Sequence, residues 1–197
     1  MKNPMMFTAT AVLCATLTLR AQDSTGALTL LPETLGPMEK LMWSEKGAMR
    51  KLFDFPLTQE GRENEMHLRR NMLGLHQLGG FVTLASMITT VVLGQTVYNG
   101  KKDLSQIHGA MAWTTIGAYF TTASLSIFTP PPLIRRKNWS SISTHKLLAT
   151  MHLTGMIITP LLGRAVRGGE RDLATVHLVS AYATTALFGA AIFTVTF

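Results

Sequence analysis

Residues 104 to 128 read LSQIHGAMAWTTIGAYFTTASLSIF. This stretch contains no Asp, Glu, Lys or Arg, and it is long enough to cross the ~30 Å hydrocarbon core of a bilayer as a helix. Apart from Tyr119, its only ionisable side chain is His108, which lies near the start of the apolar run. Because an imidazole at that depth is costly unless it has a partner or binds a metal, His108 is the first candidate functional residue.

The other long apolar stretches repeat this arrangement. Predicted spans cover residues 72–98, 104–128, 141–163 and 173–197, and they contain His76, His108, His145 and His177 in that order. Each histidine follows a polar boundary residue by five positions. Short connections make neighbouring helices antiparallel. The sequence therefore predicts an all-α integral membrane protein, an antiparallel four-helix bundle over residues 71–197.

Composition supports a membrane protein and excludes several kinds of site. The 197 residues are 47% hydrophobic and 15% charged. The net charge of +7 comes mostly from short clusters between the apolar runs, which favours lipid headgroups over nucleic acid. The single cysteine, Cys14, excludes an internal disulfide, an iron–sulfur cluster, a thiolate zinc site and a covalent c-type haem.

Residues 1–21 are typical of a signal peptide. Lys2 precedes an apolar run over residues 7–19, which is too short to span a bilayer, and cleavage is expected after Ala21. The alternative is an uncleaved N-terminal anchor. With cleavage, the mature N-terminus lies outside and the first span runs inward.

Residues 22–70 differ from the rest in being richer in charge. Gly36 and Pro37 indicate a helix start, apolar residues then recur at helical spacing, and Pro56 ends the pattern. We expect an amphipathic helix that lies on the membrane surface or caps the bundle, with an ordinary packed surface helix as the alternative. Residues 60–70 are predicted to lead into the first span as helix, with His67 exposed to solvent.

The depth of the four histidines predicts how they pair. In an antiparallel bundle, spans one and three start at one membrane face and spans two and four at the other, so His76 can face His145 and His108 can face His177. Two such imidazole pairs are the ligand set for two non-covalent, six-coordinate b-type haems. A lone intramembrane histidine is otherwise a packing residue or a proton carrier.

His152 leaves one assignment open. It lies seven residues after His145 on the same helical face, so it could replace His145 as the ligand or form a hydrogen bond beneath the haem. Basic residues near that face could pair with haem propionates or an anionic substrate, or simply meet lipid headgroups: Arg135, Arg136, Lys137 and Lys146.

Four core helices with ligands paired first to third and second to fourth resemble the cytochrome b561 superfamily. The matching strings are GLHQLGG at His76, IHGAMAW at His108, ISTHKLLA at His145 and TVHLVSA at His177. The resemblance implies transmembrane electron transfer from ascorbate, quinol or another donor to an acceptor on the opposite face. Many eukaryotic members have six spans, so four spans suggest a bacterial type in the cytoplasmic (inner) membrane.

Three other functions remain open from the sequence. The chain could be the haem-bearing anchor subunit of a quinone-linked dehydrogenase. It could instead be a transporter or assembly protein whose histidines carry protons or bind a metal, or a plain membrane scaffold. Expected partners are membrane lipid, a quinol or other small electron carrier or a redox protein, and a second copy in a homodimer; nucleic acid is not expected. Whether the chain is itself an enzyme stays undecided.

Overall fold

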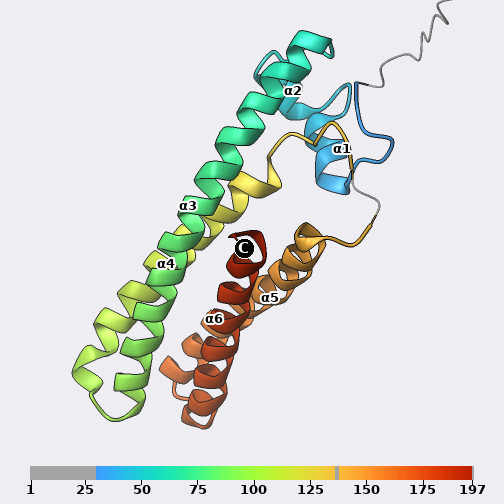
Figure 1. Cartoon of the computed structure of the whole chain (residues 1–197). Coiled ribbons are helices and arrows are strands. Elements are labelled where there is room, and N and C mark those ends of the chain that lie inside the picture. Colours follow the sequence, from blue (N-terminus) through green and yellow to red (C-terminus); the bar gives the residue numbers. More distant parts are fainter. Residues whose placement is uncertain (1–29, 136–137, 197) are drawn as a thin grey trace, which may run out of the picture.

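The computed structural model describes residues 30–135 and 138–196, and over these residues it contains helices and no strand (Figure 1). The predicted signal peptide, residues 1–21, lies outside the described residues, as do Arg136 and Lys137. In chain order the elements are α1 (Pro37–Trp43), α2 (Ala48–Leu52), α3 (Gln59–Tyr98), η1 (Lys102–Leu104), α4 (Ser105–Ile127), α5 (Ser141–Arg167), η2 (Arg171–Leu173) and α6 (Ala174–Thr196). The all-helical prediction is confirmed for this part of the chain.

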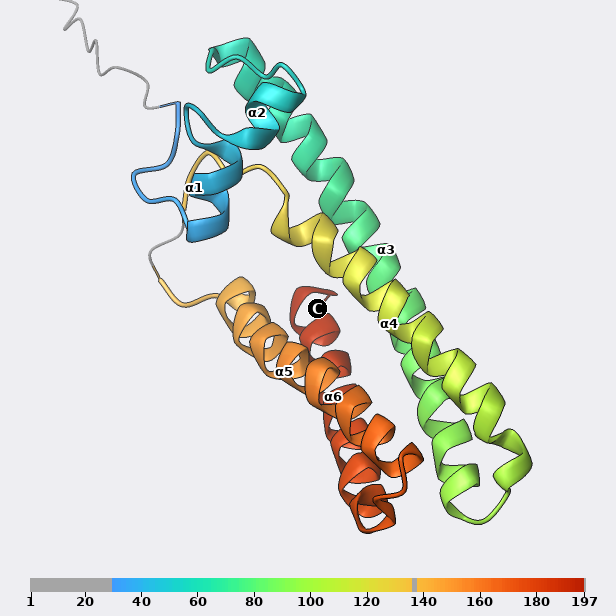
Figure 2. The same cartoon turned by 180° about the vertical axis from the view of Figure 1, so that it is seen from behind.

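The four long helices form two antiparallel hairpins that lie side by side (Figures 1 and 2). Helices α3 and α4 form the first hairpin, α5 and α6 form the second, and α3 packs against α6 between them. Both hairpins turn at the same end of the molecule, here named the turn end. Gly100 and Gly169 take φ angles of 106° and 118° in these turns, a conformation that favours glycine.

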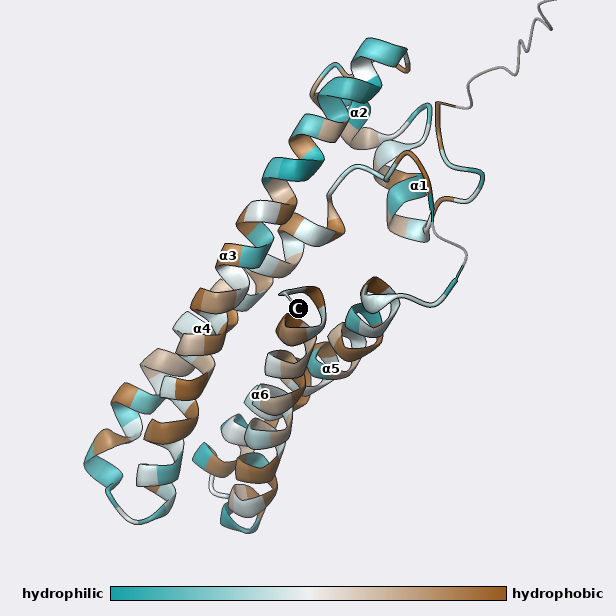
Figure 3. Cartoon of the chain, in the orientation of Figure 1, coloured by the Kyte–Doolittle hydropathy of each residue, from teal (hydrophilic) through white to brown (hydrophobic). Residues whose placement is uncertain are grey.

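Three of the long helices are long and apolar enough to cross a membrane: Gln59–Tyr98, Ser141–Arg167 and Arg171–Thr196. Apolar residues run along the lower parts of both hairpins, whereas the first turns of α3 are hydrophilic (Figure 3). Large apolar side chains are also exposed along these helices, as expected of a surface that faces lipid. Examples are Leu78, Val92, Leu161 and Val179.

The centre of the molecule is a small aromatic and methionine cluster. Met87, Tyr119, Met156 and Phe188, one from each long helix, are buried against one another. Threonine hydroxyls link α3 to α4 on either side of it, through Thr83–Thr122 at 3.3 Å and Thr90–Thr115 at 2.8 Å.

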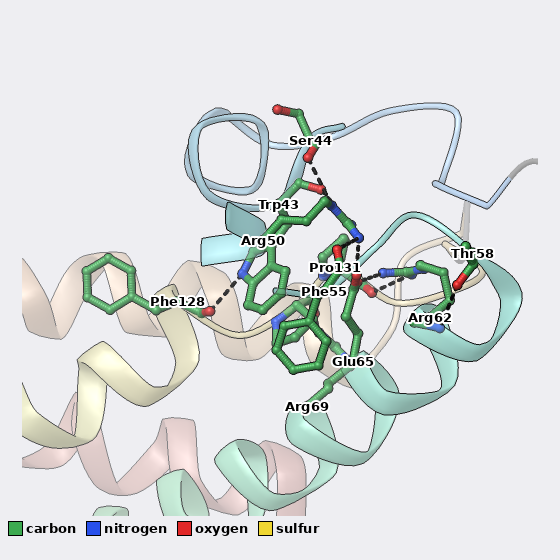
Figure 4. A network of polar contacts seen from close by, with 12 residues as sticks. Trp43, Ser44, Arg50, Phe55, Thr58, Arg62, Glu65, Arg69, Phe128 and Pro131 are labelled. Atoms are coloured by element: carbon green, nitrogen blue, oxygen red, sulfur yellow. Dashed lines mark hydrogen bonds and ion pairs between the residues drawn. The ribbon is translucent and has the colours of Figure 1, made fainter. Parts of the chain in front are cut away.

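Helices α1 and α2 lie at the end opposite the turns, here named the cap end (Figure 1). Polar contacts join them to α3 and α4 (Figure 4). Trp43 is fully buried, and its indole N–H donates to the Phe128 carbonyl at the end of α4, 2.9 Å away. Arg50 of α2 and Arg62 of α3 both pair with the buried Glu65 carboxylate. The N-terminal segment is therefore held to the first hairpin by a buried ion-pair network.

The single amphipathic helix expected after Gly36 is instead two short helices. The chain turns at residues 44–47, where a Cβ on Gly47 would lie 2.3 Å from the Met42 carbonyl oxygen. Arg50 lies in the segment that we expected to form this amphipathic helix, but it is buried, because Glu65 compensates its charge. The predicted start at Pro37 and the helical 60–70 region are both present, and His67 is exposed.

Candidate functional site: two histidine pairs

His76 of α3 and His145 of α5 face each other on the cap-end side of the central cluster. Their ring centroids are 6.2 Å apart, and the ring planes are perpendicular, at 90°. The two residues come from different hairpins, so this pair bridges the gap between them.

His108 of α4 and His177 of α6 form a second pair at the turn end. Their centroids are again 6.2 Å apart, with the planes at 70°. His108 packs on Gly94, which lies 18 residues after His76 on α3, so the two pairs are about 27 Å apart along that helix. The structure thus brings together the four histidines in the pairs expected from their depth.

The Nδ1 atom of each histidine bonds to a backbone carbonyl on the neighbouring helix of the same hairpin. His76 reaches Thr122 at 2.8 Å and His108 reaches Thr90 at 3.1 Å. In the second hairpin the carbonyls belong to Ala191 for His145 and Thr159 for His177, both at 2.9 Å. Each carbonyl oxygen accepts a backbone hydrogen bond within its own helix, and its second lone pair can accept another from the imidazole.

These bonds select one tautomer of each imidazole. A carbonyl oxygen can only accept, so Nδ1 must carry the hydrogen and donate it. The proton on Nδ1 leaves Nε2 with a free lone pair. A metal-bound histidine characteristically donates its other ring N–H to a carbonyl or carboxylate in this way, which fixes the orientation of the ring and raises its basicity.

Two glycines allow the turn-end rings to approach the backbone. A Cβ on Gly94 would lie 2.9 Å from Cε1 of His108, and a Cβ on Gly163 would lie 2.8 Å from Cε1 of His177. Contacts below 3.0 Å are essentially never made by real Cβ atoms. Any other residue at these positions would therefore displace the imidazole.

The separation of the rings in each pair would allow both imidazoles to hold one haem iron. A metal–imidazole nitrogen bond is about 2 Å long, and a ring nitrogen lies about 1.2 Å from its ring centroid. Two such ligands on opposite sides of one metal place their centroids about 6 Å apart, as both pairs do. The donor set fits too, because haem iron needs only two ligands from the protein.

His152 lies away from both pairs, although it belongs to the same helix as His145. It is buried, its Nδ1 lies 3.0 Å from the Tyr119 hydroxyl, and its ring packs against Phe188 with centroids 4.9 Å apart. In this position it extends the central cluster. The structure therefore places His145, and not His152, opposite His76.

The basic residues at the cap end differ from one another in their partners and exposure. Arg135 pairs with Glu39 of α1, and Lys146 is exposed. Arg69, which sequence reasoning did not single out, donates to the Pro130 carbonyl. It lies seven residues before His76 and hence on the same side of α3.

An internal repeat, also missed by the sequence reasoning, relates the two hairpins. His76 and His145 are 69 positions apart, and so are His108 and His177. The same offset relates further elements of the site: Thr90 to Thr159, Gly94 to Gly163, Gly100 to Gly169, Met87 to Met156, and Tyr119 to Phe188. Comparison of the chain with itself at this offset would have identified the residues whose carbonyls accept from the histidines, and the glycines beside the rings, as parts of one repeated unit.

No family model, curated protein or solved structure matches this chain. Within residues 30–135 and 138–196, no group of three or more His, Cys, Asp or Glu side chains is arranged to hold a metal ion.

Proposed function

We propose that this protein is a b-type cytochrome that transfers electrons across a membrane with two bis-histidine haems. His76 and His145 would hold one haem, and His108 and His177 the other. The observation that carries the proposal is the repeated pair of imidazoles, with centroids 6.2 Å apart and every Nδ1 committed to a carbonyl.

Bound haem would supply a one-electron Fe(III)/Fe(II) couple. The chain's own contribution is to orient the four imidazoles, to present Nε2 as the free nitrogen, and to exclude water. The cluster of Met87, Tyr119, Met156 and Phe188 fills the space between the two pairs with buried side chains. Such a low-dielectric surrounding shifts the reduction potential of a cofactor and protects it from side reactions.

The carbonyl bonds favour ligation over proton carriage. A histidine that relays protons must release a proton from one ring nitrogen and accept one on the other. Here Nδ1 of all four residues is hydrogen-bonded to a carbonyl, and this bond would have to break at each proton transfer. Metal transport through a site of three or more protein ligands gains no support from the described residues.

The proposal requires α4 to cross the membrane with the other three long helices. Its 23 residues contain no charged side chain and would extend about 35 Å. Two of its exposed hydroxyl groups donate to carbonyls within the helix, Thr114 to Ala110 and Ser124 to Phe120. These bonds lower the cost of placing hydroxyls in lipid. We place the protein in a bacterial cytoplasmic membrane with the cap end outside, in keeping with the predicted signal peptide.

The test is a haem assay on the detergent-purified full-length protein, produced with ample haem. The proposal predicts two non-covalent protohaems per chain, extractable in acid acetone, with low-spin bands in the reduced-minus-oxidised spectrum. A colourless protein that is folded and helical would overturn it. Copurification with soluble flavin or iron–sulfur subunits would instead identify the chain as the anchor of a larger dehydrogenase.

A further inference from the structure

The side chain of Arg167 reaches from the end of α5 across to α4. Its Nη2 atom lies over the buried Gly109, where an added Cβ would be only 2.6 Å away. Gly109 directly follows His108, the turn-end ligand proposed on α4. Because glycine has no Cβ, the guanidinium can approach the backbone of α4 one residue from a proposed haem ligand.

Arg167 also lies on the face of α5 that contacts the other histidine of the turn-end pair. It follows Gly163 by four residues, and residues at this spacing share a helix face. Gly163 lies against the ring of His177. Arg167 is therefore about 6 Å further along α5 toward the turn end than the residue that contacts His177. The guanidinium thus lies on the outer side of the turn-end pair.

The charge of Arg167 has no counter-ion among residues 30–135 and 138–196, in which the three ion pairs all lie at the cap end. Arg167 lines a pocket of about 550 Å³ whose other charged lining residues are Lys102 and Asp103. The two cations outnumber the one carboxylate. A guanidinium with donors to spare at the edge of an apolar bundle is suited to hold an anionic group of a ligand.

The internal repeat has no second arginine at this position. The counterpart of Arg167 is Tyr98, which follows Gly94 by four residues as Arg167 follows Gly163. The Tyr98 hydroxyl lies 3.0 Å from the hydroxyl of Thr175. A neutral side chain therefore satisfies the packing of this position in the first hairpin. This difference favours a role toward a ligand for the cation in the second hairpin.

We infer that Arg167 binds a propionate carboxylate of the turn-end haem, an assignment that rests on the proposed function. Protohaem carries two propionates, and a carboxylate is costly to bury in hydrocarbon, so these groups belong at the polar end of the site. A guanidinium can donate two parallel hydrogen bonds to one carboxylate. Two axial imidazoles leave the macrocycle free to rotate about the axis that joins them. Arg167 is a positioning residue that removes this freedom.

A comparison of protohaem with its dimethyl ester, in which both carboxylates are blocked, tests this role. The full-length protein is produced without haem and titrated in detergent with each of the two compounds. The His76→Ala background leaves only the turn-end site to be filled. In that background Arg167→Gln removes the cation and Arg167→Lys keeps it. Arg164→Gln is the matched control, because Arg164 is an exposed arginine of the same helix, three residues earlier.

We expect Arg167→Gln to weaken protohaem binding about tenfold, the equivalent of one charge-assisted hydrogen bond, and to leave binding of the dimethyl ester unchanged. Arg167→Lys should recover part of the loss, and Arg164→Gln should bind protohaem as the parent does. An equal loss of affinity for both compounds would make Arg167 a structural residue and overturn the inference. Unchanged protohaem affinity in Arg167→Gln would overturn it in favour of a lipid headgroup or solvent as the partner.

The haem content of the wild type separates this inference from the proposed function. A wild type with two haems, together with an Arg167→Gln variant that binds protohaem as tightly as its parent, loses the propionate contact and keeps the cytochrome assignment. A folded wild type that binds neither compound loses the cytochrome assignment itself.

Discussion

The Nδ1 atom of His108 lies 3.1 Å from the carbonyl oxygen of Thr90, 18 residues earlier in the chain. The bond joins α4 to α3 and fixes the proton on Nδ1, so Nε2 is the nitrogen available to a ligand. His177 and Thr159 repeat the relationship with the same separation of 18 residues in the second hairpin. A hydrogen bond within each hairpin thus orients the ring that the hairpin presents to its neighbour.

Each single substitution of one of the four histidines should remove one haem, and the two histidines of a pair should remove the same one. We expect His76→Ala and His145→Ala to lose one and the same haem, and His108→Ala and His177→Ala to lose the other. Haem counting together with potentiometric titration would identify which haem remains. The exposed His67→Ala is the control and should retain both.

His152→Gln should also retain both haems, because His152 bonds to Tyr119 and lies outside the pairs. Loss of one haem from His152→Gln, together with retention of both in His145→Ala, would show that the cap-end ligand has been assigned to the wrong residue.

Gly94→Ala should displace the His108 ring, because the added Cβ would lie 2.9 Å from Cε1. Gly163→Ala should act on His177 in the same way, at 2.8 Å. We expect each variant to lower the haem content toward one per chain, as measured by pyridine haemochrome assay. Gly117→Ala, which has open space around its Cβ, should keep two; an equal loss there would mean that contact of the added Cβ with the histidine ring is not the cause.

Tyr119→Phe should destabilise the central cluster without removing haem. The substitution leaves the buried Nδ1 of His152 without its 3.0 Å partner, at a cost of about 1–3 kcal/mol. The expected result is a drop of several degrees in the thermal unfolding midpoint, followed by circular dichroism at 222 nm. Tyr98→Phe removes an exposed hydroxyl bond and should change the midpoint much less.

Glu65→Gln should detach helices α1 and α2 from the first hairpin. It leaves Arg50 and Arg62 facing each other in a buried site, and breaking such a pair costs about 3–5 kcal/mol. Limited proteolysis should then cleave between residues 44 and 58 at lower protease concentration than in the wild type. Glu63→Gln, an exposed neighbour on the same helix, should show the wild-type pattern.

The helices and the pairing of the histidines were accessible to sequence reasoning because both follow from periodicity and depth. A histidine at a fixed distance from the start of an apolar run has a known depth along its helix. Because neighbouring helices are antiparallel, this depth determines which two histidines lie at the same level. Thr83 and Met87 follow His76 by 7 and 11 residues, and Thr115 follows His108 by 7, so helical spacing puts them on the same faces as the histidines, and all three are buried.

The groups that orient the histidine rings could not be predicted from the types of the residues that carry them. The carbonyls of Thr122, Thr90, Ala191 and Thr159 are backbone atoms, which any residue supplies, so their side chains carry no signal. Gly94 lies 18 residues after His76 and so on the same face of α3, yet it packs under His108. The offset of 69 residues was the one signal in the sequence that linked these positions.

The cap was the part least accessible from the sequence. Alternating charges after Gly36 are typical of a solvated helix face, yet Arg50 is buried against Glu65, fifteen residues later. That burial depends on a partner brought in by the start of α3. A local pattern cannot contain that information, so the break at Gly47 and the network around Glu65 required the structure.

The most direct measurement is the haem stoichiometry and reduced-minus-oxidised spectrum of the purified full-length protein, compared with the His145→Ala variant. The account predicts two low-spin b-type haems per chain in the wild type and one in the variant. A folded protein without haem, or a variant that retains both haems, would contradict the assignment of the two histidine pairs as axial ligands.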